Sequence, residues 1–147
     1  IDNRGGKIVD FLVANRLSKN AVLVEIKTPQ TPLLGGEYRQ GVHSPSSDLS
    51  GAVAQVQNYK QSLIEHYPEI AGKYSESFDT FYPSCAVIAG DSVAELTSDD
   101  KRQSFEQFRN GLRDVSVITF DELFGKLETL VTLMEGTIER EASFARD

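Results

Sequence analysis

The chain has 147 residues, of which 39% are hydrophobic and 25% charged, and its formal net charge at pH 7 is -7. This length and composition are typical of one globular domain with a buried core, so we expect residues 1–147 to form a single domain. No apolar run approaches the roughly 20 residues of a membrane-spanning helix, which excludes an integral membrane protein. A single cysteine excludes an internal disulfide and a zinc–thiolate cluster, and it favours a reducing, cytoplasmic location.

The charge is divided unevenly along the chain. Residues 1–60 carry a net charge of +2, whereas residues 61–147 carry a net charge of -9. An acidic chain has no general basic surface for a polyanion. A nucleic acid is therefore expected to approach the N-terminal half, if it binds at all.

The first elements along the chain are two strands. Residues Lys7–Val13 and Ala21–Lys27 are apolar and rich in β-branched residues, which favours strands. The polar segment Asn15–Asn20 between them predicts a hairpin turn. Residues 28–47 contain three prolines and three glycines and predict a long connection, of the kind that is usually functional or mobile.

Helices and strands alternate in the rest of the chain. Ser47 is the expected N-cap of a helix that ends at Pro68, because apolar residues between them recur at steps of three and four. Ser84–Gly90 is an apolar run of strand length, expected to be covered on both faces. The remaining expected elements are a helix from Ser98 or Asp99 to about Leu112, a strand at Val115–Phe120, and a long helix capped by Asp121.

The order of these elements predicts the fold class. The strand–helix–strand run in the second half favours parallel pairing through a crossover, whereas the opening hairpin is antiparallel. We therefore expect an α/β protein whose mixed sheet, an antiparallel hairpin plus parallel strands, is flanked by helices. The apolar stripe of the last helix runs to Ile138 and is either core or a contact with another subunit.

An acid and a base stand at the end of the second expected strand. Strand alternation places Glu25 and Lys27 on the same face. If Arg16–Lys19 form a four-residue turn, partner numbers in the hairpin sum to 35 and Asp10 faces Glu25, with their Cβ atoms about 4.5–5.5 Å apart. Two carboxylates at that distance repel each other, so either a shared proton or a bound cation must offset the repulsion.

A divalent metal is the natural counter-ion, because Mg²⁺ takes one or two carboxylates together with waters and a phosphate. Asp10 and Glu25 would then be metal ligands, and Lys27 would hold the scissile phosphate or lower the pKa of the attacking water. This arrangement is a site for metal-assisted phosphodiester hydrolysis. The alternative is a structural salt bridge, in which Lys27 neutralises Glu25 and Asp10 is solvated at a sheet edge.

Two motifs resemble those of a nuclease superfamily. Asp10, followed after fourteen residues by Glu25-Ile26-Lys27, resembles the PD-(D/E)xK signature, with Val9 where that signature has proline. Gln55 and Tyr59 resemble the Gln-x-x-x-Tyr motif of the RecB-like branch, and their spacing places both on one helical face that is able to reach toward the Glu25–Lys27 strand. The alternative for this pair is a half-buried helix edge without a catalytic role.

A closer resemblance lies within residues 24–60. The strings VEIKTP, TPLLGGEYRQGVHSPS and DLSGAVAQVQNY are similar to the nuclease domain of Shedu antiphage-defence proteins, over roughly residues 6–125. This resemblance implies a PD-(D/E)xK fold, nicking or cleavage of DNA with Mg²⁺ or Mn²⁺, and homo-oligomeric assembly. It implies that Asp10 and Glu25 are metal ligands, that Lys27 is the catalytic lysine, and that Gln55 is an accessory active-site residue.

The resemblance also implies a variable N-terminal region that controls the nuclease. Because the sequence begins with Ile1 rather than Met and has no signal-peptide pattern, we expect it to be a fragment of a longer chain. Free nuclease activity would harm the host, so the missing region is expected to restrain it.

Candidate DNA contacts lie in the connection after Lys27 and on the next helix. Arg39, His43 and Ser44 are expected to contact the phosphate backbone, as is Tyr59. No base-reading motif is present, so we expect recognition of backbone and shape rather than of sequence. The alternative for residues 28–47 is a structural loop that packs its two leucines beneath it.

Two other functions fit the same residues. One is a catalytically silent PD-(D/E)xK module kept for DNA binding or oligomeric assembly, which the negative net charge favours mildly. The other is an enzyme that acts on RNA or branched DNA, because the expected site handles only the phosphate.

Overall fold

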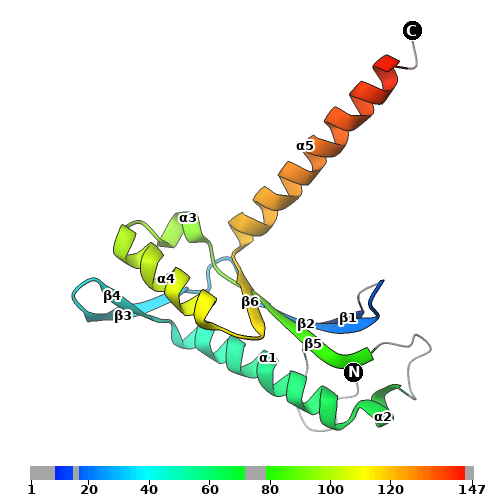
Figure 1. Ribbon diagram of the computed structural model, residues 1–147. Coiled ribbons are helices and arrows are strands. Elements are labelled where there is room, and N and C mark those ends of the chain that lie inside the picture. The colour runs from blue at the N-terminus through cyan, green and yellow to red at the C-terminus, as the bar shows by residue number, and fades with distance from the viewer. Residues whose placement is uncertain (1–8, 15–16, 72–78, 145–147) are drawn as a thin grey trace.

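The computed structural model describes residues 9–14, 17–71 and 79–144. Its centre is a four-stranded sheet with the spatial order β1-β2-β5-β6. Strand β1 (Phe11–Ala14) is antiparallel to β2 (Asn20–Ile26), whereas β5 (Asp79–Ile88) and β6 (Val115–Ile118) run parallel to β2 (Figure 1). The expected α/β fold with a mixed sheet and flanking helices is confirmed.

The register of the opening hairpin is the expected one. Phe11 pairs with Val24, and Ala14 pairs with Ala21, so the partner numbers sum to 35. Asp10 directly precedes β1, and its Oδ2 accepts the backbone N–H of Ile26, the residue that follows Glu25. The strand expected from Lys7 begins in the structure at Phe11; residues 1–8 of that expectation, and residues 15 and 16 of the turn, lie outside the described residues.

Helix α1 (Ser47–Glu65) covers one face of the sheet by packing on β2 and β5. Its N-cap is Ser46, one residue earlier than expected, because the Ser46 hydroxyl accepts the backbone N–H of Leu49 at 2.9 Å. The helix ends at Glu65 rather than at Pro68. The buried residues of α1 recur at the predicted helical spacing: Leu49, Ala52, Val53, Val56 and Leu63.

A short second helix explains why Pro68 does not end the first one. Helix α2 (Tyr67–Ala71) begins two residues after Glu65, and Pro68 lies in its first turn. The backbone N–H groups of a first turn have no partner within the helix, so the missing N–H of proline costs nothing there.

Residues 28–47, expected to be a connection, contain a second hairpin. Strand β3 (Leu34–Arg39) pairs antiparallel with β4 (Val42–Pro45), with irregularities in the register. Gly41 forms the tight turn with a φ of +73°, a conformation that favours glycine. The hairpin packs through β4 on α4 (Asp99–Gly111). The glycines that favoured a loop therefore serve a hairpin that depends on a distant helix.

The crossover from β5 to β6 contains two helices. Helix α3 (Ser92–Glu95) was not predicted, whereas α4 follows its N-cap Ser98 as expected. Strand β5 begins at Asp79 and ends at Ile88. The expected strand at Ser84–Gly90 therefore began five residues too late and ended two residues too late.

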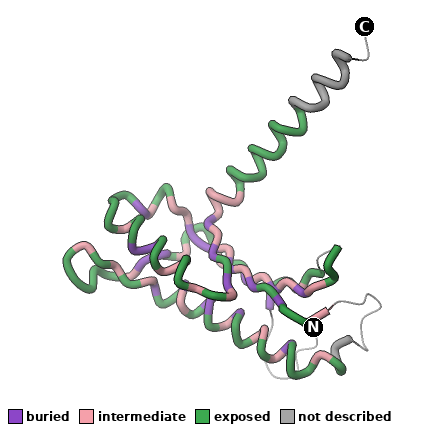
Figure 2. Tube along the Cα trace, viewed as in Figure 1, coloured by how far each residue is buried: buried purple, intermediate pink, exposed green. Residues whose placement is uncertain are grey.

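Helix α5 (Phe120–Phe144) begins one residue before the expected cap. Asp121 therefore lies inside the helix, and its carboxylate accepts hydrogen bonds from the backbone N–H and the hydroxyl of Ser92. Helix α5 extends away from the sheet, and its described side chains beyond the first turn are exposed (Figures 1 and 2). None of the helices in the described ranges is long and apolar enough to span a membrane.

The two faces of the sheet differ in burial. Leu23 and Val87, on the face under α1, are buried, whereas Val24 and Ile88 on the other face are half-buried. Phe11, which pairs with Val24, is 55% exposed. Strand β5 was expected to be covered on both faces; the described residues cover only one of them fully.

Candidate active site

Glu25 and Lys27 form an ion pair at the carboxyl end of β2. Glu25 is only 2% exposed and lies beside Val87 of β5. The backbone N–H of Lys27 donates to the carbonyl of Ile88 at 2.8 Å, which continues the strand ladder by one residue. The side chain of Lys27 therefore returns to the face of Glu25, and its Nζ lies 2.7 Å from Glu25 Oε1. The expected shared face is confirmed.

The second carboxylate oxygen of Glu25 has no such partner. Oε2 is buried and accepts no hydrogen bond from the described residues. A buried carboxylate oxygen without a partner is unfavourable by several times the thermal energy. The ion pair and the exposed Asp10 agree with the structural alternative, which leaves Oε2 without a partner; a bound cation would supply one.

Asp10 supplies the second acid. Its side chain is exposed, and its Oδ2 accepts the backbone N–H of Ile26 at 2.7 Å. This bond fixes the carboxylate at the end of β2, on the backbone of Ile26. In the described ranges, no group of three or more His, Cys, Asp or Glu residues is arranged to hold a metal. Asp10 and Glu25 are nevertheless of the ligand type that Mg²⁺ takes, since this ion commonly binds one or two carboxylates and completes its shell with waters and phosphate.

Gln55 and Tyr59 lie on one face of α1, as expected. Both are half-buried, and the Gln55 amide nitrogen donates to the Tyr59 hydroxyl at 2.8 Å. Tyr59 also packs against the core. The hydrogen bond described for Gln55 is therefore to its neighbour on the helix and not to Glu25 or Lys27, so its accessory role stays a prediction.

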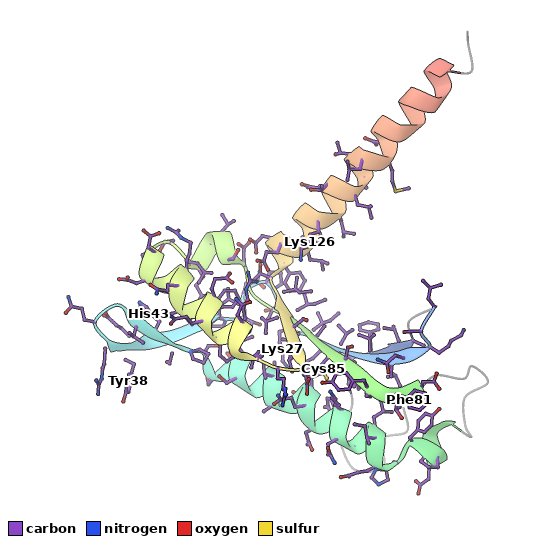
Figure 3. The ribbon with its side chains drawn as sticks, viewed as in Figure 1. Lys27, Tyr38, His43, Phe81, Cys85 and Lys126 are labelled. Carbon is purple, nitrogen blue, oxygen red and sulfur yellow. The ribbon has the colours of Figure 1, made fainter. Side chains whose placement is uncertain are left out.

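The three candidate DNA contacts of residues 28–47 all lie on the β3–β4 hairpin. Arg39 is exposed, and its guanidinium lies 5.7 Å from the ring of Tyr38. His43 is half-buried, while Ser44 is exposed. Figure 3 shows Tyr38 and His43 on the hairpin, at the side of the molecule away from β1.

The base of the hairpin has a packing role. Leu33 is fully buried and Leu34 is 8% exposed. The structural alternative therefore holds for the base of this segment, whereas its tip carries the exposed polar side chains. Residues 28–47 therefore combine a packed base with exposed side chains near the turn of the hairpin.

A separate hollow of about 630 Å³ opens beside β6. It is lined by α4 and α5 side chains such as Arg109 and Lys126. Arg109 is already paired there with Glu106 and Glu122, the latter at 2.8 Å. None of Asp10, Glu25 and Lys27 lines this hollow, so its chemistry is distinct from that of the β2 site.

Sequence reasoning missed the residues that hold the hairpin in place. Glu95 accepts hydrogen bonds from the backbone N–H groups of Leu33 and Leu34, and Ser104 accepts one from that of His43. These partners are 61 or 62 residues apart along the chain. No local motif marks such a contact, so spacing alone gives no signal for it.

The fold and the site together define a class of protein. The class is an α/β domain with a four-stranded mixed sheet and flanking helices, in which a buried Glu and a Lys lie at the end of β2 and an Asp directly precedes β1.

Comparisons with known proteins give the family. The family model described as "Shedu protein SduA, C-terminal" matches residues 1–124. Shedu protein SduA of Bacillus cereus (strain B4264) is 49% identical over 142 residues, which cover 92% of this chain and 37% of that protein. The chain belongs to the Shedu SduA C-terminal family of antiphage defence. It spans 37% of the length of this curated relative.

Proposed function

We propose that the chain is a divalent-metal-dependent DNA endonuclease domain of an antiphage defence protein, which nicks or cleaves DNA by hydrolysing phosphodiester bonds. The observation that carries the proposal is the buried Oε2 of Glu25, which accepts no hydrogen bond from the described residues, on a carboxylate whose other oxygen is paired with Lys27. A bound Mg²⁺ or Mn²⁺ ion would supply positive charge that offsets the two carboxylates and polarises the phosphate.

The side chains of the site have separate tasks in this proposal. The 2.7 Å bond from Lys27 holds Glu25 in one orientation, and the N–H of Ile26 holds Asp10. The side chain of Lys27 is 31% exposed, so its ammonium is accessible to a phosphate bound at the site. There it stabilises the negative charge that builds on the phosphate oxygens in the transition state. Gln55, oriented by Tyr59, is the proposed accessory residue.

The test is a cleavage assay on supercoiled and linear duplex DNA with Mg²⁺, Mn²⁺ or EDTA. The variants are Asp10→Asn, Glu25→Gln and Lys27→Met, which keep the approximate shapes of the side chains. Lys126→Ala on α5 and Glu69→Gln on α2, both exposed, control for the loss of one charge. We expect metal-dependent cleavage that falls by at least about a hundredfold in the three site variants and stays unchanged in the controls.

Two outcomes would contradict the proposal. Cleavage that survives Glu25→Gln and Lys27→Met would place the active site elsewhere. No cleavage by the wild type with either metal, but retained DNA binding, would favour the catalytically silent module, in which the Glu25–Lys27 pair is only structural. Cleavage of RNA or branched substrates in preference to duplex DNA would redefine the substrate but keep the site.

The proposal includes assembly with further copies of the chain. It is supported by the described stripe of α5, where Phe124, Leu127, Val131 and Met134 are about half exposed. Their spacing alternates between three and four residues, as in helices that pack on another helix. Light scattering after size exclusion tests this, with Leu127→Glu expected to lower the mass. An unchanged mass for this variant would exclude the stripe as the contact.

The proposed control of the nuclease lies outside residues 1–147. Its support is the length of the Bacillus cereus relative, of which this chain covers 37%. We expect the complete protein to cleave DNA more slowly than residues 1–147 until it is activated. Equal rates on identical DNA would refute this restraint.

A further inference from the structure

The base of the β3–β4 hairpin is held by a carboxylate from a distant helix. Glu95, the last residue of α3, accepts the backbone N–H of Leu33 with Oε2 at 2.7 Å and that of Leu34 with Oε1 at 2.8 Å. Each oxygen accepts one N–H group: Oε1 accepts that of Leu34, where β3 begins, and Oε2 accepts that of Leu33 just before it. Hydrogen bonds to a charged acceptor are roughly twice as strong as those between neutral groups. Glu95 therefore clamps the hairpin at its base.

Lys27 is held by a different set of bonds. Its backbone N–H donates to the Ile88 carbonyl at 2.8 Å, and the N–H of Gly90 donates to the Thr28 carbonyl at 3.0 Å. Neither bond involves Glu95. The end of β5 thus positions Lys27, whereas Glu95 positions the segment that starts six residues later. The hydrogen bonds described for Lys27 and those from Glu95 to the hairpin base are therefore different bonds.

The hairpin is also anchored on α4, where Gly41 of its turn lies close to Asp100, whereas the side chains of Tyr38 and Arg39 are exposed. The backbone N–H of His43 donates to the Ser104 hydroxyl at 3.1 Å, and β4 packs on α4. At the tip, Tyr38 is 74% exposed beside the guanidinium of Arg39. An arm fixed at two points presents these side chains in one direction relative to β2. Preorganisation of this kind lowers the entropy that binding must otherwise remove.

We propose that Glu95 is a positioning residue for DNA binding. It fixes the β3–β4 hairpin at the angle to β2 at which Arg39 meets the phosphate backbone of a duplex held at the Glu25–Lys27 site. This inference rests on the proposed nuclease function and deepens it. It predicts that loss of the clamp weakens DNA binding but leaves the chemical step intact, because the bonds of Lys27 are untouched.

The experiment is single-turnover cleavage of a labelled linear duplex with enzyme in excess. It gives the maximal rate constant and the enzyme concentration at half-saturation separately. In Glu95→Gln the amide keeps the shape of the side chain, but its NH₂ group cannot accept the second backbone N–H. We expect half-saturation at about fivefold higher enzyme, with an unchanged maximal rate. Glu69→Gln, which removes an exposed carboxylate from α2, should leave both values unchanged.

A double-mutant cycle tests whether Glu95 acts through the hairpin. Arg39→Ala should raise half-saturation by itself. If the clamp works only by placing Arg39, the Arg39→Ala/Glu95→Gln variant should bind no more weakly than Arg39→Ala. Amide exchange provides a readout that is independent of DNA: Leu33 and Leu34 should exchange faster in Glu95→Gln, while the buried turns of α1 keep their protection.

Three outcomes would overturn the inference. A fall in the maximal rate that matches the loss of binding would mean that Glu95 acts on Lys27 or on the whole fold. Additive effects of the two substitutions would separate Glu95 from the hairpin contact. Unchanged binding by Glu95→Gln, with a wild type that cleaves normally, would reject the clamp but keep the nuclease. If the wild type cleaves no DNA, the proposed function fails. DNA binding by the wild type and by Glu95→Gln is then compared by fluorescence anisotropy, and equal half-saturation in the two proteins would reject the clamp.

Discussion

Substitution of Lys27 by methionine is predicted to destabilise the fold, because it leaves the buried carboxylate of Glu25 without its ion-pair partner. Methionine keeps the length of the aliphatic stem and removes the ammonium. Glu25 is 2% exposed, and the only hydrogen bond described for its carboxylate is the 2.7 Å bond from Lys27. Breaking a fully buried ion pair costs about 3–5 kcal/mol. Because the Lys27 side chain is 31% exposed and water can replace part of it, we expect about 2–3 kcal/mol.

The assay is thermal unfolding followed by circular dichroism at pH 7 in EDTA. For a chain of this size, about 1 kcal/mol corresponds to roughly 2–4 °C. We therefore expect Tm to fall by about 5–10 °C in Lys27→Met. Glu25→Gln should be at least as stable as the wild type, because an uncharged amide is less costly to bury than a carboxylate. Lys126→Ala, on the exposed surface of α5, controls for the loss of a lysine.

The relative Tm of Lys27→Met and Glu25→Gln tests whether Glu25 is a buried charge held by Lys27. A wild-type Tm for Lys27→Met, or a Glu25→Gln variant less stable than Lys27→Met, would show that the carboxylate is not a buried charge supported by one partner. Addition of Mg²⁺ extends the test, since a ligand that binds only the folded state raises Tm. We expect this increase in the wild type and its loss in Glu25→Gln. An equal increase in both would remove Glu25 from the metal site.

Two further predictions concern stability away from the site. Gly90 has a φ of +67°, and a Cβ there would lie 2.5 Å from Leu33 Cδ2, so Gly90→Ala should lower the free energy of unfolding in urea by about 2–4 kcal/mol. The control Gly36→Ala, where a Cβ would have no atom within 4 Å, should change it by less than about 1 kcal/mol. Equal effects of the two substitutions would refute the close approach of Leu33 to Gly90. Burial opposes ionisation of Asp121, but hydrogen bonds from Ser92 outweigh it and lower the Asp121 pKa to about 2, so its contribution to the free energy of unfolding is complete above its usual pKa and is lost as the pH falls from about 4 to 2. Asp121→Asn should flatten that part of the pH profile of Tm, and an unchanged profile would assign the acid transition to other groups.

The register of the first two strands was predictable because it depends on local rules. A side-chain period of two residues and a short turn are sufficient to predict it, and the observed pairing of Phe11 with Val24 follows the expected sum. The ion pair of Glu25 with Lys27 follows from the same period. What these residues do chemically is a proposal, which the buried Glu25 Oε2 without a described hydrogen-bond partner supports.

The β3–β4 hairpin was not predictable from local rules. Its prolines and glycines are typical of a loop, and its strands are irregular. It exists in this form because Glu95 holds Leu34 and because Ser104 holds His43, across more than 60 residues of chain. The position of Asp121 was misjudged for a similar reason, since its partner is Ser92 on another helix. Tertiary contacts decided these positions over local propensity.

The distances along the chain between contacting residues also set the order in which the site is built during synthesis. Asp10 meets Ile26 across 16 residues, whereas Leu33 meets Glu95 across 62. Contacts between near residues close early, and parallel pairing waits for distant chain to emerge. A nascent chain that ends before Ile88 already contains both acids and Lys27, but it lacks the β5 carbonyl that fixes the Lys27 backbone. The hydrogen bond of Asp10 to the end of β2 is therefore able to form before β5 and α3 have been synthesised. A product truncated before Ile88 would contain Asp10, Glu25 and Lys27, but not the carbonyl that positions Lys27.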